Sequence, residues 1–316
     1  MPVYGTEKTV VRAIESVRSQ TDEDFELIIV NDQSPDNSKK VILDHLSTSP
    51  DYRIRYIEND KNIGLALSRN HGMDEARGEW IAFLDSDDAY QPNFLEIMHK
   101  NTLDADLVVA AHDVAYQDGA HRYRQYTSPG VYDKYRAQKM ALQFKLTPFA
   151  WDKLFRSSTV GSLRFPAINR VEDAGFSIPF MGQVKQIRVI PDSLYLYSVN
   201  PQSITWGSVP PISETYKFMS HIKETTCAHN GSEAQKNAFA VTWVVNWLNS
   251  AQSALRLQPA NSTMHIKQCR DAMKFSTLLR CFISRPVIGS AGLLFKFTPV
   301  LYNLIYKTYV RYSYGL

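Results

Sequence analysis

A cluster of carboxylates follows a short apolar segment near residue 85. Residues 81–84 are apolar, and Asp85, Ser86, Asp87 and Asp88 come directly after them. Carboxylates held this close repel one another, so we expect a hard divalent ion, Mg²⁺ or Mn²⁺, to neutralise them. Such ions commonly take one or two carboxylates while substrate phosphates complete the octahedron, which suits a diphosphate substrate. The alternative is a solvated turn in which Asp85 or Asp88 caps the next helix.

Polar and aromatic residues also follow three other segments of the first seventy residues. They are Val3, Tyr4 and Glu7; Asn31, Asp32, Gln33 and Ser34; and Asn62, Ile63 and Gly64 followed by Ser68, Arg69 and Asn70. Taken singly, each set has an ordinary structural explanation as core, turn, cap or surface residues. In this order and spacing, they predict a nucleotide site with a guanidinium nearby.

The segments that must position these residues alternate between two periodicities. Apolar residues recur at helical spacing in 10–17, 41–46 and 65–76, and short apolar runs occupy 25–30, 54–57 and 80–84. This alternation predicts an α/β, Rossmann-like fold with a mostly parallel sheet flanked by helices. Ligands of such sheets bind at the carboxyl ends of the strands, where the residues described above lie.

The expected elements extend beyond the first hundred residues. Apolar patterns predict strands at 106–111, 186–190 and 194–199 and helices at 134–144, 172–181 and 232–257. In the last of these helices Trp243 and Trp247 lie one turn apart, and we expect them in the core. The chain begins at the turn that would follow a first strand, so we also expect this strand to be truncated and a longer native product to exist.

Length and composition predict a globular protein. Its 316 residues, 44% hydrophobic and 21% charged, exclude a disordered or collagen-like chain. A net charge of +3 is small for a dedicated nucleic-acid binder. Three cysteines without ligand-like spacing disfavour a disulfide framework or a cysteine zinc site and fit a reducing compartment. Because no secretory signal opens the sequence, we expect a cytoplasmic location.

Four segments of the first hundred residues resemble the family 2 glycosyltransferases of GT-A fold. They are residues 2–7, 25–36, 62–72 and 78–88. Weaker similarity resumes at 151–156, 164–166, 171–173 and 194–198. The resemblance implies a catalytic domain at 1–210, with a nucleotide-sugar-binding half at 1–100 and an acceptor-binding half at 101–210. It does not cover residues 211–316, which we expect to form a helical, basic C-terminal region.

The resemblance also implies a role for individual residues. The nucleotide sugar would contact Val3, Tyr4, Glu7, Asp32, Gly64, Arg69, Asp85 and Ser86. Of these, Val3, Tyr4 and Asp32 would hold the base, normally uracil, with Glu7 close by. Asp87 would bind the metal directly, with Asp85 facing the ribose or a metal-bound water. Trp151 and Lys153 are candidates to position the acceptor, although packing of an amphipathic strand on the sheet explains them nearly as well.

Sugar transfer from a diphosphate requires two kinds of chemical assistance. The reaction passes through an oxocarbenium-like centre, so the departing diphosphate must be stabilised and the acceptor hydroxyl must lose a proton. The first task suits a metal on Asp87 aided by Arg69. Glu172 and Asp173, at the start of an expected helix, are candidates for the general base of an inverting reaction, and the resemblance favours Asp173. The alternative is that these acids only complement the helix dipole.

The end of the chain has a distinct charge pattern. Residues 255–316 contain nine Lys or Arg and one acid. One expected helical face carries Leu294, Phe297, Leu301, Leu304 and Ile305. With cations on the other face and a kink at Pro299, this pattern is typical of an interfacial helix on an anionic leaflet. A basic helix packed on the catalytic domain is the other possibility. The first of these interpretations predicts peripheral attachment to the cytoplasmic face of the inner membrane.

The sequence as a whole predicts a hexosyl- or N-acetylhexosaminyltransferase. Its donor would be a nucleotide sugar, and a UDP-sugar is the favoured kind. Its acceptor would be a hydroxyl group of a saccharide or a lipid-linked saccharide. The reaction would serve the synthesis of a surface polysaccharide or glycolipid. A metal-dependent nucleotidyltransferase is the alternative enzyme, but residues 3–7 lack the Gly-rich, basic loop that cradles a triphosphate. A non-catalytic nucleotide-sugar-binding module is the third possibility. We expect no nucleic-acid partner.

Overall fold

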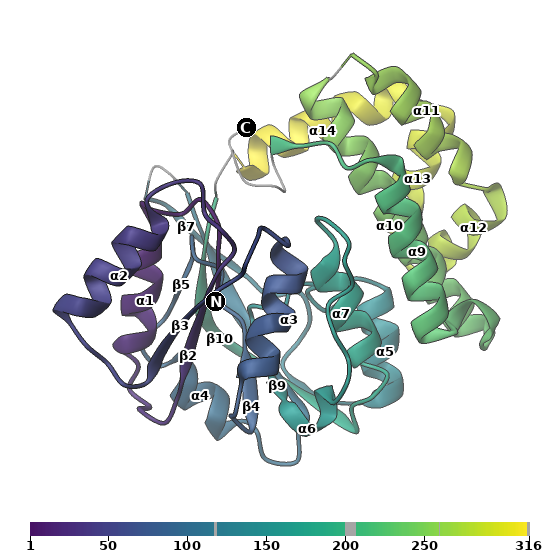
Figure 1. Cartoon of the computed structure of the whole chain (residues 1–316). Helices are drawn as coiled ribbons and strands as arrows, with labels where there is room; N and C mark the ends of the chain where they lie inside the picture. The colour runs from purple at the N-terminus through teal and green to yellow at the C-terminus, as the bar shows by residue number, and fades with distance from the viewer. Residues whose placement is uncertain (117–118, 200–206, 259, 315–316) are drawn as a thin grey trace. The chain divides into compact units, whose positions relative to one another are not determined.

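The computed structural model describes the chain except for residues 117–118, 200–206, 259 and 315–316 (Figure 1). The chain forms two compact units. The first comprises residues 1–137, 147–167 and 172–199, and the second comprises 138–146, 168–171 and 200–316. Segments 138–146 and 168–171 thus belong to the same unit as the C-terminal helices. The sequence suggested instead a single division of the chain near residue 210.

The first unit begins with a small parallel sheet and the helices that connect its strands. Its strands are β1 (Pro2–Val3), β2 (Leu27–Asn31) and β3 (Ile54–Glu58), and its helices are α1 (Val10–Arg18), α2 (Ser38–Thr48) and α3 (Leu65–Glu75). All strand pairs in this sheet, in the order β1-β2-β3, are parallel. The predicted alternation of helix and strand is therefore confirmed. The first strand has only two residues, which pair with Val30 and Asn31.

A second, mixed sheet of seven strands completes this unit. It contains β4 (Trp80–Ala82), β5 (Ala89–Tyr90), β6 (Leu107–Ala115), β7 (His121–Arg124), β8 (Gly130–Asp133), β9 (Lys153–Arg156) and β10 (Gln186–Ser198). The order of its main path is β4-β9-β6-β10-β5, and only β6 and β10 pair in parallel. The α/β class with a parallel sheet is confirmed, but β4 pairs with β9 rather than extending the first sheet. The two strands expected at 186–190 and 194–199 are one strand with register shifts on either side of Ser193.

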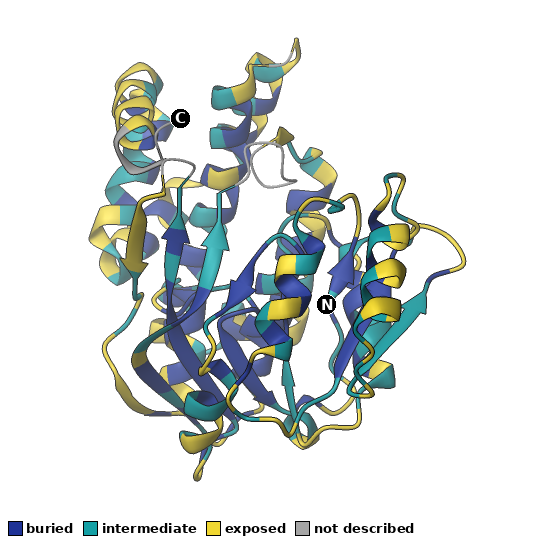
Figure 2. Cartoon of the chain, turned by 90° about the vertical axis from the view of Figure 1, so that its left-hand side faces the viewer, coloured by how far each residue is buried: buried dark blue, intermediate teal, exposed yellow. Residues whose placement is uncertain are grey.

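Both sheets contribute to one hydrophobic core. The remaining helices of the first unit are α4 (Phe94–Lys100), α6 (Ser157–Val160) and α7 (Glu172–Phe180), and α5 (Lys134–Leu142) begins in the first unit and continues into the second. Helix α1 buries Val10, Ala13, Ile14 and Val17, the positions that its spacing predicted. Figure 2 shows the strands largely buried and the helices exposed on their outer sides. The loops that carry the polar residues thus follow strands that are buried or partly buried.

The second unit is helical. Its principal elements are α9 (Ile212–Thr226), η1 (Ala228–Asn230), α10 (Glu233–Leu257), α11 (Ser262–Ala272), α12 (Phe275–Ser284), α13 (Pro286–Phe297) and α14 (Pro299–Tyr314). The long α10 starts with a capping box between Ser232 and Gln235. Trp247 is fully buried and Trp243 packs against the same core, as predicted. In the chain as described, no helix has both the length and the apolar character needed to cross a membrane.

Candidate active site

The acids after β4 lie in three different environments. Asp85 is partly exposed, and its Oδ1 lies 2.7 Å from Nη2 of Arg69. Asp87 is also partly exposed, and Arg12 donates a hydrogen bond to its backbone carbonyl. Asp88 is buried and accepts hydrogen bonds from the hydroxyl of Tyr195 and from a backbone N–H of β10, each at 2.7 Å. Burial raises the pKa of Asp88 well above its usual value. Asp88 is therefore a structural acid, while Asp85 and Asp87 remain accessible.

These environments change the electrostatic argument made from the sequence. The sequence suggested that three crowded carboxylates need a metal ion, or that Asp85 or Asp88 caps the next helix. Helix α4 begins after Asn93 instead, and no side chain caps it. The repulsion is relieved in part by the guanidinium beside Asp85 and in part by hydrogen bonds to Asp88. Asp85 and Asp87 are therefore the two partly exposed carboxylates of this loop.

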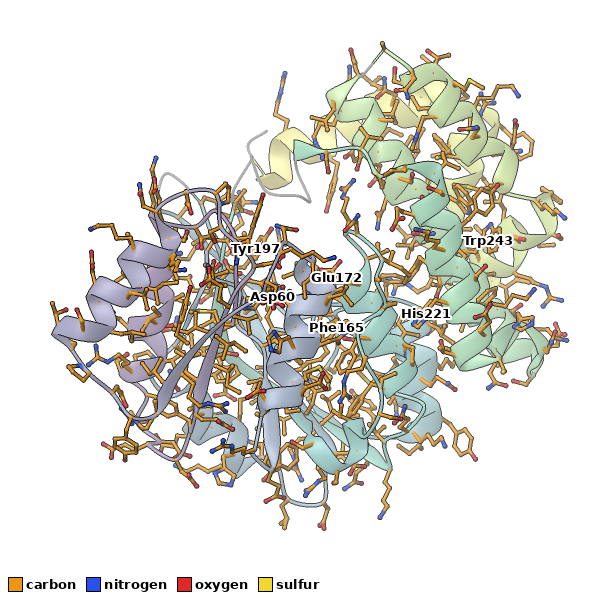
Figure 3. All side chains as sticks on the ribbon, viewed as in Figure 1. Asp60, Phe165, Glu172, Tyr197, His221 and Trp243 are labelled. Carbon is orange, nitrogen blue, oxygen red and sulfur yellow. The ribbon has the colours of Figure 1, made fainter. Side chains whose placement is uncertain are left out.

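Arg69 on α3 joins this loop to the start of α7. Its side chain is 1% exposed, and its Nη1 lies 3.0 Å from Oε1 of Glu172 and 2.6 Å from Oδ1 of Asp173. Its guanidinium carbon also lies 5.3 Å from the centre of the Phe165 ring. Figure 3 labels Glu172 and Phe165 in this part of the first unit. One buried cation thus gathers three acids that are up to 104 positions away from it in the sequence.

The burial of Arg69 bears on the role that the resemblance implied, which stays a prediction. The sequence suggested that this guanidinium lines the diphosphate. Burial alone would lower its pKa, but the carboxylates of Asp173, Asp85 and Glu172 raise it, so the side chain stays charged. Because three carboxylates already surround its donors, Arg69 acts on the site by holding the acids in place.

Glu172 and Asp173 occupy the first turn of α7, as the sequence predicted. Burial raises the pKa of Asp173 to about 7, with Arg69 opposing the shift and the charges of Glu172 and Asp85 adding to it. Burial likewise raises the pKa of Glu172. Oε2 of Glu172 is buried and has no hydrogen-bond partner among the described residues. A carboxyl group that titrates near neutral pH is suited to general-base chemistry, so Asp173 has the required property.

Asp32 at the end of β2 shapes the loop before α3. Its Oδ1 accepts hydrogen bonds from the side chain of Asn59 and the N–H of Ile63, and its Oδ2 accepts one from the N–H of Gly64, all at 2.8 Å. Gly64 has φ +87°, a conformation that other residues rarely adopt, and it directly precedes the first turn of α3. Asp32 therefore fixes the position from which Arg69 extends.

The loop after β1 contacts the acidic loop directly. Thr6 and Thr9 donate hydrogen bonds of 3.0 Å to the hydroxyl and the carbonyl of Ser86, which is buried. Glu7 accepts a hydrogen bond of 2.9 Å from the N–H of Asn37 at the start of α2. In the same loop Val3 is buried, whereas Tyr4 is 53% exposed. The structure therefore brings the loops after β1, β2 and β4 together and leaves an aromatic ring accessible at their edge.

Trp151 and Lys153 lie in the core of the first unit. Trp151 is 3% exposed and stacks on the rings of Phe149, Tyr195 and Tyr197. Nζ of Lys153 is buried and lies 2.6 Å both from Oδ1 of Asp152 and from the carbonyl of Phe149. Neither side chain is exposed, and their role in positioning an acceptor stays a prediction. Strand packing, the alternative weighed from the sequence, accounts for both residues.

Lys153 is expected to contribute strongly to stability. Removing its charge in Lys153→Met would leave the carboxylate of Asp152, which is 0% exposed, without its cation. Breaking a buried pair in this way costs about 3–5 kcal/mol. The free energy of unfolding in urea, measured for the wild type and the variant, checks this expectation. The double variant Asp152→Asn/Lys153→Met should recover part of the loss, and no recovery would contradict it.

The donor set at Asp85 and Asp87 fits a hard divalent cation. Both are carboxylates at the end of a strand and both are partly exposed. Mg²⁺ and Mn²⁺ bound together with substrate phosphates use one or two such ligands. Across the described ranges, no three His, Cys, Asp or Glu side chains are grouped so that they could hold a metal ion by themselves. The two carboxylates could therefore hold such an ion only together with further oxygen ligands.

Some residues of the site carried too weak a signal to be found in the sequence. The hydroxyl of Tyr195 donates a hydrogen bond to Asp88. Tyr195 lies in segment 194–198, whose weak resemblance to the family implies no role for any one residue. Its alternation with Tyr197 along the strand was the available signal, because both rings stack on Trp151. Phe165 could not be found from spacing, since its contact with Arg69 depends on the tertiary fold.

Comparisons with known proteins agree on one family. The model of "Glycosyl transferase family 2" matches residues 1–158, half of the chain. The putative glycosyltransferase EpsH of Bacillus subtilis is 31% identical over 210 residues, which cover 64% of this chain and 60% of EpsH. The chain therefore matches about three fifths of the length of this curated relative.

Two solved structures are similar in fold. S. aureus TarS 1-349 in complex with UDP-GlcNAc aligns with a TM-score of 0.67 at 15% identity, covering 99% of this chain and 90% of that chain. Mannosyltransferase PcManGT from Pyrobaculum calidifontis, in complex with GDP-Man and Mn²⁺, aligns with a TM-score of 0.56 at 14% identity, covering 98% and 84%. From the family match and the shared fold, the chain belongs to glycosyl transferase family 2 and has the GT-A fold.

Proposed function

We propose that the protein is an inverting glycosyltransferase. It would move a hexosyl or N-acetylhexosaminyl group from a UDP-sugar to a hydroxyl of a saccharide or lipid-linked saccharide, in the synthesis of a surface polysaccharide or glycolipid. One observation carries this proposal: Arg69 places a carboxyl group with a pKa of about 7, Asp173, beside the accessible acids that follow β4. Such a site contains a group that can accept a proton, Asp173. It also contains two residues, Asp85 and Asp87, that could bind a diphosphate through a cation.

The donor would lie along the loops that follow β1, β2 and β4. Tyr4 is exposed and its flat ring can contact a nucleotide base, while the loop shaped by Asp32 offers backbone groups beside it. Asp85 and Asp87 would hold Mg²⁺ or Mn²⁺, which supplies positive charge to the leaving diphosphate. The UDP-GlcNAc bound by TarS, whose fold is similar, supports a nucleotide-sugar donor.

Asp173 would act on the acceptor. Its carboxylate removes the proton of the acceptor hydroxyl as that oxygen forms a bond to the anomeric carbon. The bond from the anomeric carbon to the diphosphate oxygen breaks on the opposite face, so the diphosphate leaves with the bonding electrons and the configuration inverts. Arg69 keeps Asp173 in position, and Phe165 packs beneath the guanidinium. The N-terminus of α7 adds a favourable field for the ionised form.

The proposal is tested with a panel of nucleotide sugars in the presence of Mn²⁺ or Mg²⁺. We expect UDP release from at least one UDP-sugar and near-complete loss of that release in Asp87→Ala, because the variant removes a proposed metal ligand. Asp44→Asn is the matched control, since Asp44 is an exposed acid paired with Lys40 on α2. Chelation of the metal should abolish release in the wild type.

Three outcomes would contradict the proposal. Pyrophosphate release from UTP and a sugar phosphate would favour a nucleotidyltransferase. Binding of UDP-sugars without any turnover would favour a non-catalytic binding module. Full activity of Asp87→Ala would remove the proposed metal site.

We further propose that the protein acts in the cytoplasm, at the inner face of the membrane. A lipid-linked acceptor would be presented there, and the basic composition of residues 255–316 favours contact with anionic lipid. In this proposal residues 1–210 form the catalytic domain, in which residues 1–100 bind the donor and residues 101–210 bind the acceptor. Residues 211–316 make the membrane contact.

A further inference from the structure

We propose that one surface of the C-terminal helices docks on an anionic lipid bilayer. This surface, the C-terminal docking face, is formed by Phe275, Phe297, Val300, Leu301, Leu304 and Ile305. It lies wholly within the second unit, on the first turn of α12, the end of α13 and the first half of α14. The proposal specifies the surface that makes the membrane contact proposed above and rests on that contact, and it holds whichever donor and acceptor the first unit uses.

Helix α14 exposes its aliphatic side. Val300 is 84% exposed and Leu304 is 65% exposed, and Leu301 and Ile305, each one position further along, are about half exposed. Residues four positions apart lie on the same side of a helix, so these four side chains form one stripe. The buried side of the helix carries Tyr302 and Val310 instead. A helix whose only role was to pack on the protein would bury its aliphatic side chains rather than expose them.

The inner side of α14 is firmly attached to the second unit. The hydroxyl of Tyr302 accepts a hydrogen bond of 2.7 Å from Gln252 on α10, and its ring packs edge-on against the buried Phe295 of α13. Tyr306 stacks against Tyr302 in the same row. Because these contacts fix the rotation of the helix, the exposed aliphatic stripe is a built surface rather than a consequence of a loose helix end.

Two aromatic rings extend the stripe beyond α14. Phe297 at the end of α13 is 61% exposed, and its ring centre lies 6.4 Å from that of Phe275, which is 62% exposed. Phe297 is separated from Val300 only by the turn between the two helices. Exposed aromatic rings next to aliphatic side chains suit the boundary between headgroups and acyl chains.

Charge selects an anionic lipid surface as the occupant. Lys274 adjoins Phe275, and Lys307 and Arg311 lie on the exposed part of α14. The single acid of residues 255–316, Asp271, is paired with Lys267 at 2.9 Å. Each cation near an anionic leaflet adds attraction that is screened by salt. Apolar burial and cationic attraction thus act on the same surface, which is the combination that holds interfacial helices on membranes.

The test is co-sedimentation of the full chain with vesicles. We expect the wild type to bind vesicles of phosphatidylcholine mixed with phosphatidylglycerol, and to bind phosphatidylcholine alone much more weakly. Leu301→Glu/Leu304→Glu should lower the binding constant at least about tenfold, because it replaces two apolar contacts with charges. The matched control is Leu43→Glu/Leu103→Glu, which changes two leucines of similar exposure, 42% and 72%, in the first unit. Circular dichroism and the melting temperature should be alike in all three proteins.

A second pair of variants tests the charge separately. Lys307→Gln/Arg311→Gln should weaken binding to the mixed vesicles about 10- to 30-fold and reduce its dependence on salt between about 0.1 M and 1 M. Binding that is unchanged in Leu301→Glu/Leu304→Glu, or lowered equally by the control, would overturn the proposal. The proposal would also be overturned if the wild type bound neither vesicle and formed a dimer that Leu301→Glu/Leu304→Glu dissociates. That result would show that the face joins two copies of the chain.

Discussion

Asp173→Asn is expected to slow sugar transfer by about 10²- to 10⁴-fold, the range that general-base catalysis contributes. Asparagine keeps the shape of the side chain but does not accept the proton of an acceptor hydroxyl. The variant should still bind the donor, since Asp173 is assigned to the acceptor side. Rates of UDP release at saturating donor, together with calorimetric titration of the UDP-sugar, measure the two effects separately.

The dependence of this reaction on pH follows from the burial of Asp173. Because the pKa of the carboxyl is raised to about 7, the fraction of ionised base increases as pH rises through neutrality, and kcat should increase with it. The charge of Glu172 contributes to the raised pKa, so Glu172→Gln should move the rise to lower pH and retain turnover. A pH profile that is identical in the wild type and Glu172→Gln, or full activity of Asp173→Asn, would contradict this assignment.

Arg69→Met is expected to cause the largest loss of stability among the variants of the site. It would leave Asp85, Glu172 and Asp173 close together without the buried cation that they share. Removing one partner of a buried ionic cluster costs about 3–5 kcal/mol, and turnover should fall with the misplacement of the acids. Urea denaturation at neutral pH measures the first effect and UDP release the second.

The stability of this variant should depend on pH in a defined direction. Burial raises the pKa of both Glu172 and Asp173, and without Arg69 their ionised forms lose the opposing attraction. The folded state would therefore hold more protons than the unfolded state, so stability decreases as pH rises from about 4 through neutrality. The deficit of Arg69→Met relative to the wild type should thus be smaller at about pH 5.5 than at about pH 7.5, because more of the buried carboxyl groups are protonated at the lower pH.

Arg69→Lys is the matched control for charge. It preserves the cation but offers one ammonium group in place of the planar fork that reaches three carboxylates. Its stability should fall between those of the wild type and Arg69→Met. Equal stability of all three proteins would show that the cluster is not held by Arg69.

Local pattern was sufficient for the six elements from α1 to β4, but it did not predict β5 or α4. The positions Val10, Ala13, Ile14 and Val17 predicted both a helix and its buried side, because a period of 3.6 residues records which side faces the core. The apolar run that became β2 is buried at every position, as parallel strands with covered faces require. Pairing between strands was less predictable, since β4 carries no local feature that selects β9 rather than β3 as its neighbour.

The sequence by itself determined the alternation of helices and strands, the family, and the acids that are candidates for chemistry, because residue type, order and spacing are local properties. Only the tertiary structure decided what each of these residues contacts. It buried Asp88 against Tyr195, placed Lys153 in the core and surrounded Arg69 with acids from two other segments. Charge and burial depend on neighbours that are up to 110 residues away in the chain, and no periodicity within one segment encodes those neighbours.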